Sequence, residues 1–308
     1  MIIQSLKVIY SKLILCVFLW GGTFISGRVL AQNYDPFLIS FLRFIIATIV
    51  LLLYLLIGSN QSLRLTPSKF FLVLILGVTG VFSYNYFFFS GLKIVEAGRA
   101  SVIVTTNPAV ITLFAAIFLG ESLSIRKALG AFIALLGAVI VVSDGDLFKL
   151  FGGAFGLGDV FLIFAVCSWA AYTLFGKIVL RKMTPLITTT WACILGTILL
   201  LPFALQNGLV SSIPNIKGSE WLHLVYLGAF GTSISFLLFY EGVKAIGATR
   251  AAAFINMVPI MGISMGALFF DESIALSLLI GAVFVIFGIY LVNKTDVQVT
   301  KEKPRQPF

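Results

Sequence analysis

The sequence predicts an all-α integral membrane protein in which ten transmembrane helices form two inverted five-helix repeats. Hydrophobic residues make up 60% of its 308 residues and charged residues only 11%, whereas soluble domains carry about 25% charged residues. A soluble core cannot bury so much apolar surface, and lipid is the environment that accommodates it. The apolar segments also have spanning length, and the two halves of the chain resemble each other.

Ten windows have the roughly 20 mostly apolar residues that cross a bilayer as a helix. In chain order they cover residues 12–30, 36–57, 68–92, 98–119, 126–143, 156–180, 185–205, 219–245, 249–270 and 274–292. Nine further windows follow the first, and no small-residue cleavage site closes it. We therefore interpret the first window as a helix and not as a signal peptide.

The net charge of +9 follows the positive-inside rule and does not indicate a nucleic-acid partner. With the N-terminus in the cytoplasm, most Lys and Arg residues fall on the inner side of the predicted helices. An even number of spans returns the C-terminus to the same side. The sequence predicts a multi-pass protein of the cytoplasmic (inner) membrane, with the lipid bilayer as its surroundings and both termini cytoplasmic.

Metal and cofactor chemistry have little basis in this sequence. The three cysteines, Cys16, Cys167 and Cys193, all fall inside predicted spans and read as small apolar residues. His223 is the single histidine, so no second imidazole completes a site with it. We expect no metal and no cofactor.

The internal repeat has an offset of 149 residues early in each half and 151 later. Trp20 aligns with Trp169 and Pro36 with Pro185, and the segment GLKIVEAGRA at 91–100 then aligns with GVKAIGATRA at 242–251. The sequence thus predicts repeats at 12–143 and 156–292, followed by a cytoplasmic tail at 293–308. Five spans is an odd number, so the second copy enters the membrane from the opposite face. Such inverted repeats are typical of secondary transporters, whose substrate site lies near the midplane between the repeats.

A set of short motifs extends across residues 12–292 and occurs in both halves. They include FLWGGTF at 18–24, DPFLISFLRF at 35–44, GLKIVEAGRAS at 91–101, NPAV at 107–110 and FLGESLS at 118–124, and later SWAAYT, GATRAA, VP and DES. In this order the chain resembles the ten-helix EamA-type transporters of the drug/metabolite transporter superfamily. The resemblance implies a carrier, often an exporter, for small polar or amphipathic metabolites such as amino acids or nucleotide-like compounds, with a cavity between the halves.

One departure from that superfamily bears on mechanism. Its small four-helix multidrug pumps carry an acidic residue midway along their first helix, but here the stretches 14–27 and 163–176 contain no carboxylate. Facilitated diffusion or exchange fits these residues better than proton exchange on a buried Glu.

Pro108 and Pro259 fall near the centres of the fourth and ninth predicted helices. Each removes a backbone hydrogen bond, and the carbonyls freed in this way belong to Val104 and Ile255. We expect the prolines to act as hinges beside a cavity, although packing kinks are an alternative. Asn107 and Asn256 lie beside them and are candidate substrate-binding residues, with interhelical hydrogen bonding as the alternative.

Trp20 and Trp169 occupy equivalent mid-helix positions, where an indole N–H needs a partner that a cavity could supply. Aromatic walls with a few polar groups suit an amphipathic substrate, and plain aromatic packing is the alternative. The other substrate-binding candidates of this kind are Tyr84, Asn85, Tyr172 and Tyr240.

Arg43 is the one cation predicted within a span, about 10 Å in from Pro36 at 1.5 Å per residue. Charge at such a depth is costly and indicates function by default. It could hold a substrate carboxylate or phosphate, or pair with helix-end carbonyls or snorkel to the interface. Its repeat partner is Ala192, so either role is asymmetric.

Two further patterns concern packing. Glycines recur at a spacing of seven in the fifth and tenth helices, which suits close contact either within the bundle of a monomer or between the subunits of a homodimer. Glu121 and Glu272 precede the same two helices and are expected to cap them.

Other classes of protein remain as alternatives. Gly156-Leu157-Gly158-Asp159 matches the GxGD motif of intramembrane aspartyl proteases, for which Asp35 would supply the second aspartate. That chemistry needs two carboxylates sharing a proton, and these two aspartates begin different helices near the outer surface. A membrane receptor or scaffold would not require duplicated prolines. We expect a small-molecule carrier and not an enzyme.

Overall fold

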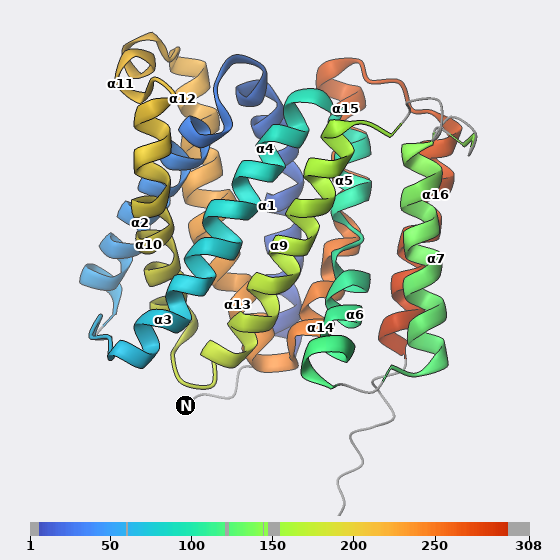
Figure 1. Cartoon of the computed structure of the whole chain (residues 1–308), viewed down its shortest axis with the longest axis horizontal. Coiled ribbons are helices and arrows are strands. Elements are labelled where there is room, and N and C mark those ends of the chain that lie inside the picture. Colours follow the sequence, from blue (N-terminus) through green and yellow to red (C-terminus); the bar gives the residue numbers. More distant parts are fainter. Residues whose placement is uncertain (1–5, 60, 121–122, 144, 147–154, 295–308) are drawn as a thin grey trace, which may run out of the picture.

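The computed structural model describes residues 6–59, 61–120, 123–143, 145–146 and 155–294. Within these ranges the only regular elements are helices, which confirms the all-α prediction. Eight helical segments are long and apolar enough to cross a membrane, and two shorter apolar helices complete the bundle. The helices stand side by side (Figure 1).

The first half of the chain supplies five spans, two of which are divided. They are α1 (Leu6–Asn33), α2 (Pro36–Gly58), α3–η1–α4 (Pro67–Leu76, Gly77–Ser83, Tyr84–Ile94), α5–α6 (Ala97–Val104, Asn107–Leu119) and α7 (Ile125–Val142). Asp35 caps α2 by accepting from the Phe37 amide at 2.8 Å. Pro36 follows in the first turn, where its missing N–H has no cost.

The second half repeats this order. Its spans are α9 (Leu157–Val179), α10 (Pro185–Gln206), α12–η3–α13 (Gly218–Val225, Tyr226–Ile234, Ser235–Ile246), α14–η4–α15 (Ala248–Ala252, Ala253–Met257, Val258–Phe270) and α16 (Leu276–Lys294). A short α11 (Leu209–Ser212) and a 3₁₀ turn, η2 (Ile213–Asn215), precede α12. Thr184 caps α10 just before Pro185, as Asp35 caps α2.

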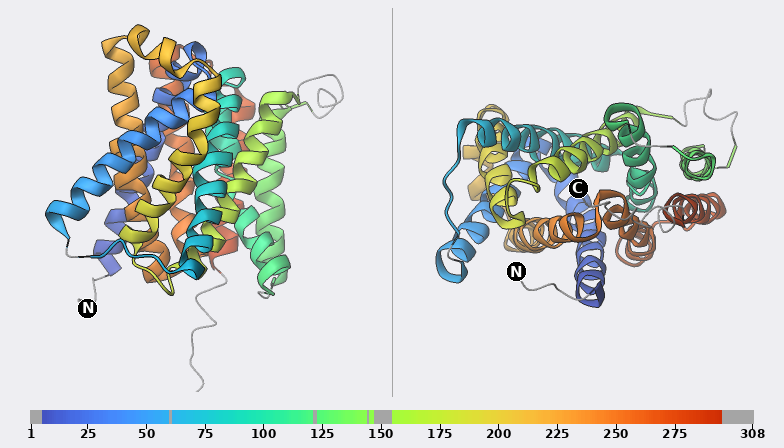
Figure 2. Two further views of the ribbon diagram at one scale, coloured as in Figure 1. Left: turned by 60° about the vertical axis from the view of Figure 1, so that its left-hand side comes forward. Right: turned by 90° about the horizontal axis from the view of Figure 1, so that it is seen from below.

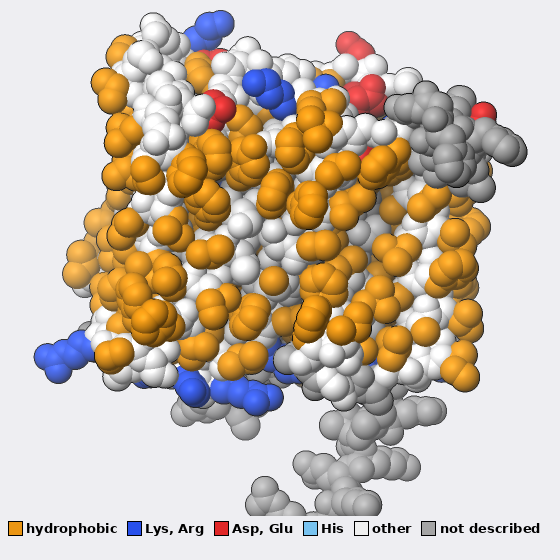
Figure 3. All heavy atoms as spheres, viewed as in Figure 1, with side chains coloured by type: hydrophobic (Ala, Val, Ile, Leu, Met, Phe, Trp, Pro, Cys, Tyr) orange, Lys and Arg blue, Asp and Glu red, His pale blue; other side chains and the backbone are white. Residues whose placement is uncertain are grey.

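The second half is inverted relative to the first. Helix α1 begins and α16 ends on the lower face in Figure 1, whereas α9 starts at the upper face and runs antiparallel to α1 (Figures 1 and 2). A broad apolar band surrounds the middle of the molecule (Figure 3). Lys and Arg side chains gather along its lower edge, and both signs of charge occur along the upper edge. This is the surface of a multi-pass membrane protein.

Residues that are copies of each other meet at the centre and at both edges of the bundle. The hydroxyls of Thr48 and Thr197 lie 3.4 Å apart, and the rings of Trp20 and Trp169 have centroids 5.3 Å apart. At the other edge α7 packs on α16, its own copy. Equivalent residues meet only on the axis that relates the halves, so a pseudo-two-fold axis passes through these three contacts.

The two halves interlock and do not merely abut. Segment α4 of the first half packs on α9 of the second, and α13 of the second packs on α1 of the first. Gly91 and Gly242 are repeat partners that allow this approach. A Cβ at Gly91 would lie 2.7 Å from Leu162, and one at Gly242 would lie 2.6 Å from Leu13. The third helix of each repeat is therefore buried mainly against the other repeat.

Each of these third helices contains a π-helical segment, η1 or η3, which the sequence analysis did not predict. The wide turns leave backbone carbonyls to be satisfied by side chains. Asn85 Nδ2 donates to the Gly80 and Val81 carbonyls at 3.1 and 2.9 Å, and Thr232 Oγ1 donates to the Leu227 carbonyl at 2.8 Å. π-helical turns are frequent at functional sites.

The two helices with central prolines are interrupted, not merely kinked. The chain turns at Thr105 and Thr106, so Pro108 lies in the first turn of a new helix, α6. The Val104 carbonyl accepts from Asn107 Nδ2 at 2.9 Å. In the second half the 3₁₀ segment η4 takes the same place, and Pro259 lies in the first turn of α15.

Two packing expectations are resolved by the structure. Glu272 does not cap α16: its carboxylate accepts from the Ala97 and Gly98 amides at 2.9 and 3.0 Å and so caps α5 of the other half. Glu121 lies outside the described residues. The glycines of the fifth and tenth helices face each other within the chain, because a Cβ at Gly130 would lie 2.5 Å from the Gly288 carbonyl oxygen.

Candidate functional site

A small cavity lies at the centre of the bundle, where the rings of Trp20 and Trp169 meet on the pseudo-two-fold axis. Its lining comes from both halves and consists of Trp20, Thr23, Phe24, Arg43, Tyr84, Val104, Asn107, Trp169, Phe236, Ile255 and Val258. The free volume is about 30 Å³. One water needs roughly 10–15 Å³ and small-molecule pockets usually measure about 300–1,000 Å³, so this conformation is closed around its centre.

Three pairs of lining residues are repeat partners. They are Trp20 with Trp169, Val104 with Ile255, and Asn107 with Val258. The second and third pairs flank the interruptions in the two broken helices. Both interruptions therefore open onto the cavity, which is the arrangement expected where irregular backbone at membrane depth contacts polar space.

The aromatic wall is tightly packed. Trp20 and Trp169 meet edge to face at an interplanar angle of 89°, and Tyr84 lies against Trp169 with ring centroids 5.0 Å apart. The Trp20 indole N–H donates to the Gly231 carbonyl at 3.2 Å. The Trp169 indole nitrogen has no hydrogen-bond partner among the described residues, although the side chain is only 4% exposed.

Arg43 reaches the cavity from α2, with its side chain directed across the bundle toward η3. Nε donates to Thr232 Oγ1 at 2.6 Å, Nη1 donates to Asn85 Oδ1 at 2.8 Å, and Nη2 donates to the Gly231 carbonyl at 3.2 Å. The guanidinium also lies 5.5 Å from the ring centre of Phe44. These contacts connect α2 to the π-helical regions of both halves, and the side chain does not snorkel to the interface.

The structure brings some of the predicted site residues to the cavity and leaves others outside it. Those that line the cavity are Trp20, Arg43, Tyr84, Asn107 and Trp169. Asn85 does not line the cavity, but its side-chain oxygen accepts a hydrogen bond from Arg43, which does. Tyr172 and Tyr240 are fully buried and stack on each other with ring centroids 5.0 Å apart, outside the lining. Asn256 belongs to η4, and its side chain lies outside the described part of the chain.

Sequence reasoning missed the other lining residues, which are Thr23, Phe24, Phe236 and Val258. It named Val104 and Ile255 only as the residues whose backbone carbonyls the prolines free. The repeat alignment carried a usable signal, because Phe236 is the repeat partner of Asn85 and Val258 that of Asn107. Transferring each candidate to its partner position would have found both.

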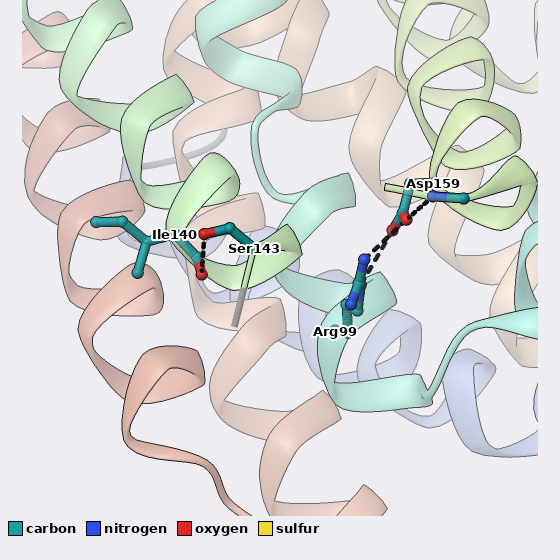
Figure 4. Close-up of polar contacts among 5 residues, drawn as sticks. Arg99, Ile140, Ser143 and Asp159 are labelled. Carbon is teal, nitrogen blue, oxygen red and sulfur yellow. Dashed lines mark hydrogen bonds and ion pairs between the residues drawn. The ribbon is translucent and has the colours of Figure 1, made fainter. Parts of the chain in front are cut away.

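The two aspartates of the protease alternative are held in local structural contacts. Asp159 forms a bidentate ion pair with Arg99, at 3.0 Å to Nε and 2.8 Å to Nη2, and also accepts from the Gly156 amide at 3.0 Å. Figure 4 shows Arg99 of α5 pointing at Asp159 of α9. Asp35 caps α2. No hydrogen bond among the described residues links one aspartate to the other, so the geometry lends the protease alternative no support.

Glu241 and Lys244 are three residues apart on one helix, a spacing that predicts an ion pair between them, but the ion pair that the structure shows for Glu241 is with another helix. The Glu241 carboxylate accepts from Lys12 Nζ of α1 at 2.6 Å, which joins the two halves at the lower face.

Comparison with known proteins finds one family of transporters and relatives named as transporters. The EamA-like transporter family matches twice, at residues 8–143 and 156–294. An uncharacterized transporter of Archaeoglobus fulgidus is 31% identical over 282 residues, covering 91% of this chain and 96% of its own. The uncharacterized transporter YyaM of Bacillus subtilis is 27% identical, covering 87% and 88%. A chloroplastic WAT1-related protein of Arabidopsis thaliana is 24% identical, covering 92% and 69%.

One solved structure shares the fold, with a TM-score of 0.69 at 23% identity, and the match covers 94% of this chain and 98% of that one. At this identity the likeness bears on the fold alone. The family matches extend over both halves, in the same order as the structural repeats. The chain is thus a multi-pass membrane protein that belongs to the EamA-like transporter family.

Proposed function

We propose that this protein is a secondary transporter that moves a small polar or amphipathic metabolite across the cytoplasmic membrane by alternating access. The observation that carries the proposal is the central cavity, which lies on the pseudo-two-fold axis and is lined by the interruptions of both broken helices. Inverted repeats make two opposite-facing states of similar energy accessible, and discontinuous helices at their interface commonly form the substrate site.

The proposed mechanism is facilitated diffusion or exchange. Of the described residues that line the cavity, Arg43 is the one with a charge, and none is a carboxylate. A proton-coupled cycle on a cavity Glu or Asp has no residue there to use. The closed cavity of about 30 Å³ requires its walls to part, and we assign the hinges to the interruptions beside Pro108 and Pro259.

We also propose that the lower face in Figure 1 is cytoplasmic, because it carries the excess of Lys and Arg (Figure 3). The start of α1 and the end of α16 then face the cytoplasm, which is the side predicted for both termini.

Purified protein in liposomes tests the proposal. Uptake and counterflow are screened across amino acids, nucleotides and other small polar or amphipathic metabolites. Trp20→Ala, Asn107→Ala and Asn256→Ala should each reduce transport of any solute that moves. Phe132→Ala is the matched control, because Phe132 of α7 is 58% exposed on the outer surface of the bundle. Wild-type rates from all three variants, at equal protein level, would contradict the site assignment.

A further inference from the structure

No acidic side chain among the described residues forms an ion pair with the buried guanidinium of Arg43. The residue is 2% exposed, and its three hydrogen-bond acceptors, on Thr232, Asn85 and Gly231, are all neutral. A guanidinium has five N–H groups, so two are left without an acceptor among the described residues. A charge held in this way keeps most of the cost of leaving water.

The acidic residues that the structure describes lie far from the middle of the bundle, in loops or within two turns of a helix end. They are Asp35, Glu96, Asp146, Asp159, Glu220, Glu241, Asp271 and Glu272. Glu241 pairs with Lys12 and Asp159 pairs with Arg99, so these two carboxylates are occupied by other cations. No acid described in the structure therefore neutralises Arg43.

Two further polar groups at the cavity are also unpartnered. Trp169 Nε1 is a donor without an acceptor, and Asn107 Oδ1 is an acceptor without a donor, among the described residues. Both side chains are at least nine-tenths buried and both line the cavity with Arg43. Buried polar atoms are normally paired, so unpaired ones around a cavity indicate a bound polar molecule in another state of the protein.

The asymmetry of the site also indicates a bound polar molecule. The repeat partner of Arg43 is Ala192, and those of Asn85 and Thr232 are Phe236 and Val81. One side of the axis therefore carries a cation and hydrogen-bonding groups, and the other side is apolar. A ligand that fits both sides has one charged end and one apolar or aromatic end.

From this arrangement we infer that the transported substrate is an organic anion, with a carboxylate or phosphate group bound by Arg43 and an apolar or aromatic body lying against Trp20, Trp169 and Phe236. The inference rests on the proposed transport function and names its substrate class. The anion supplies the missing counter-charge, and the Trp169 indole N–H is available as a further donor to it. The aromatic rings supply stacking faces for the body of the substrate.

A matched series of probes tests the inference in proteoliposomes: phenylpropionate, phenylpropionamide and phenylpropylamine share one ring and chain and differ in charge. Phenylpropionate should be taken up at least tenfold faster than its amide, a difference of about 1.4 kcal/mol. Phenyl phosphate distinguishes the two anionic groups, because its rate shows whether the site prefers phosphate to carboxylate. Faster transport of the amide or the amine would overturn the inference and leave the proposed function standing.

Two variants test the role of Arg43. Arg43→Gln should bring the ratio of anion to amide uptake close to one, whereas Arg64→Gln, which removes an exposed cation outside the bundle, should leave the ratio unchanged. Asn85→Asp covers the case in which Arg43→Gln does not fold. It places a carboxylate oxygen where the amide oxygen now lies 2.8 Å from Nη1, and it removes the two hydrogen bonds that Nδ2 donates to the Gly80 and Val81 carbonyls. The new ion pair with Arg43 offsets that loss, and the folded protein should lose its preference for anions. An unchanged preference in Asn85→Asp would refute the inference.

Binding is measured separately from transport by the quenching of tryptophan fluorescence, since Trp20 and Trp169 lie at the cavity. Quenching by phenylpropionate and not by its amide supports the anion site even if no solute crosses the membrane, in which case the proposed transport function fails alone. Equal quenching by both probes would count against the anion site.

Discussion

The crossing of α7 and α16 makes a quantitative prediction for Gly137→Ala. An added Cβ at Gly137 would lie 2.6 Å from the Gly281 carbonyl oxygen and 2.8 Å from the Val285 amide nitrogen. Ordinary van der Waals contacts begin at 3.4 Å, so the helices would have to separate by about 0.8 Å (3.4 − 2.6). Both opposing atoms belong to the backbone, and no rotamer change relieves the clash.

The size of the effect follows from two opposing terms. Overpacking a well-packed interface costs about 1–3 kcal/mol, and a gap of this width removes roughly a quarter to a half of the attraction between the atoms that face it. Alanine returns about 0.8–1 kcal/mol of helix propensity relative to glycine. We expect a net loss of about 1–2 kcal/mol in the free energy of unfolding, which corresponds to a fall in Tm of roughly 2–8 °C.

Thermal unfolding of the purified protein in detergent measures this change. Gly218→Ala is the matched control, because a Cβ there meets nothing within 4 Å, and its Tm should stay close to that of the wild type. Combining Gly137→Ala with Gly281→Ala should cost less than the sum of the single changes, since one separation of the helices relieves both. A Tm for Gly137→Ala equal to or above that of Gly218→Ala would refute the close backbone crossing.

Three other substitutions test contacts at helix ends on the upper face in Figure 1. Glu272→Ala leaves two α5 amides without their acceptor and should lower stability by about 1–3 kcal/mol, whereas Glu96→Ala, an exposed carboxylate beside the same amides, should change Tm little. Asp35→Ala removes the cap of α2 and should cost about 0.5–2 kcal/mol while the folded protein keeps its transport rate; loss of transport at equal folded protein would contradict a purely structural role. Arg99→Gln leaves its α9 aspartate buried without an ion pair and should lower Tm more than Glu96→Ala does, as measured in the same detergent assay.

Much of the architecture follows from the sequence alone. The apolar windows predict the spans because a helix that crosses lipid must satisfy its backbone internally and present an apolar surface over its whole length. The repeat follows from recurring residues such as Trp20 and Trp169, and its inversion follows from five being odd. The spans and the inverted repeat both depend only on the order of residues along the chain, and the structure shows both.

The contacts between neighbouring helices could not be predicted from the sequence in the same way. Lipid tails are as apolar as the side chains of neighbouring helices, so hydropathy does not say which helix faces which. The glycine pattern was compatible with a contact inside the bundle or with a dimer interface. The Arg43 side chain could have bound a ligand, paired with helix-end carbonyls or reached the membrane interface. Only the packed structure shows that Gly130 meets Gly288 and that Glu272 caps a helix of the other repeat.

Part of the candidate site could be predicted from the sequence, and part of it required the tertiary structure. Sequence reasoning identified Arg43, Asn107 and the two tryptophans, because polar or interfacial residues in the middle of an apolar span are conspicuous. The tertiary structure decided that the tryptophans meet on the axis. It also decided that Arg43 reaches Thr232, 189 residues away, and that no acid of the described part of the chain pairs with it. Those distances depend on how the two repeats interlock, and the order of residues along each span does not specify that interlocking.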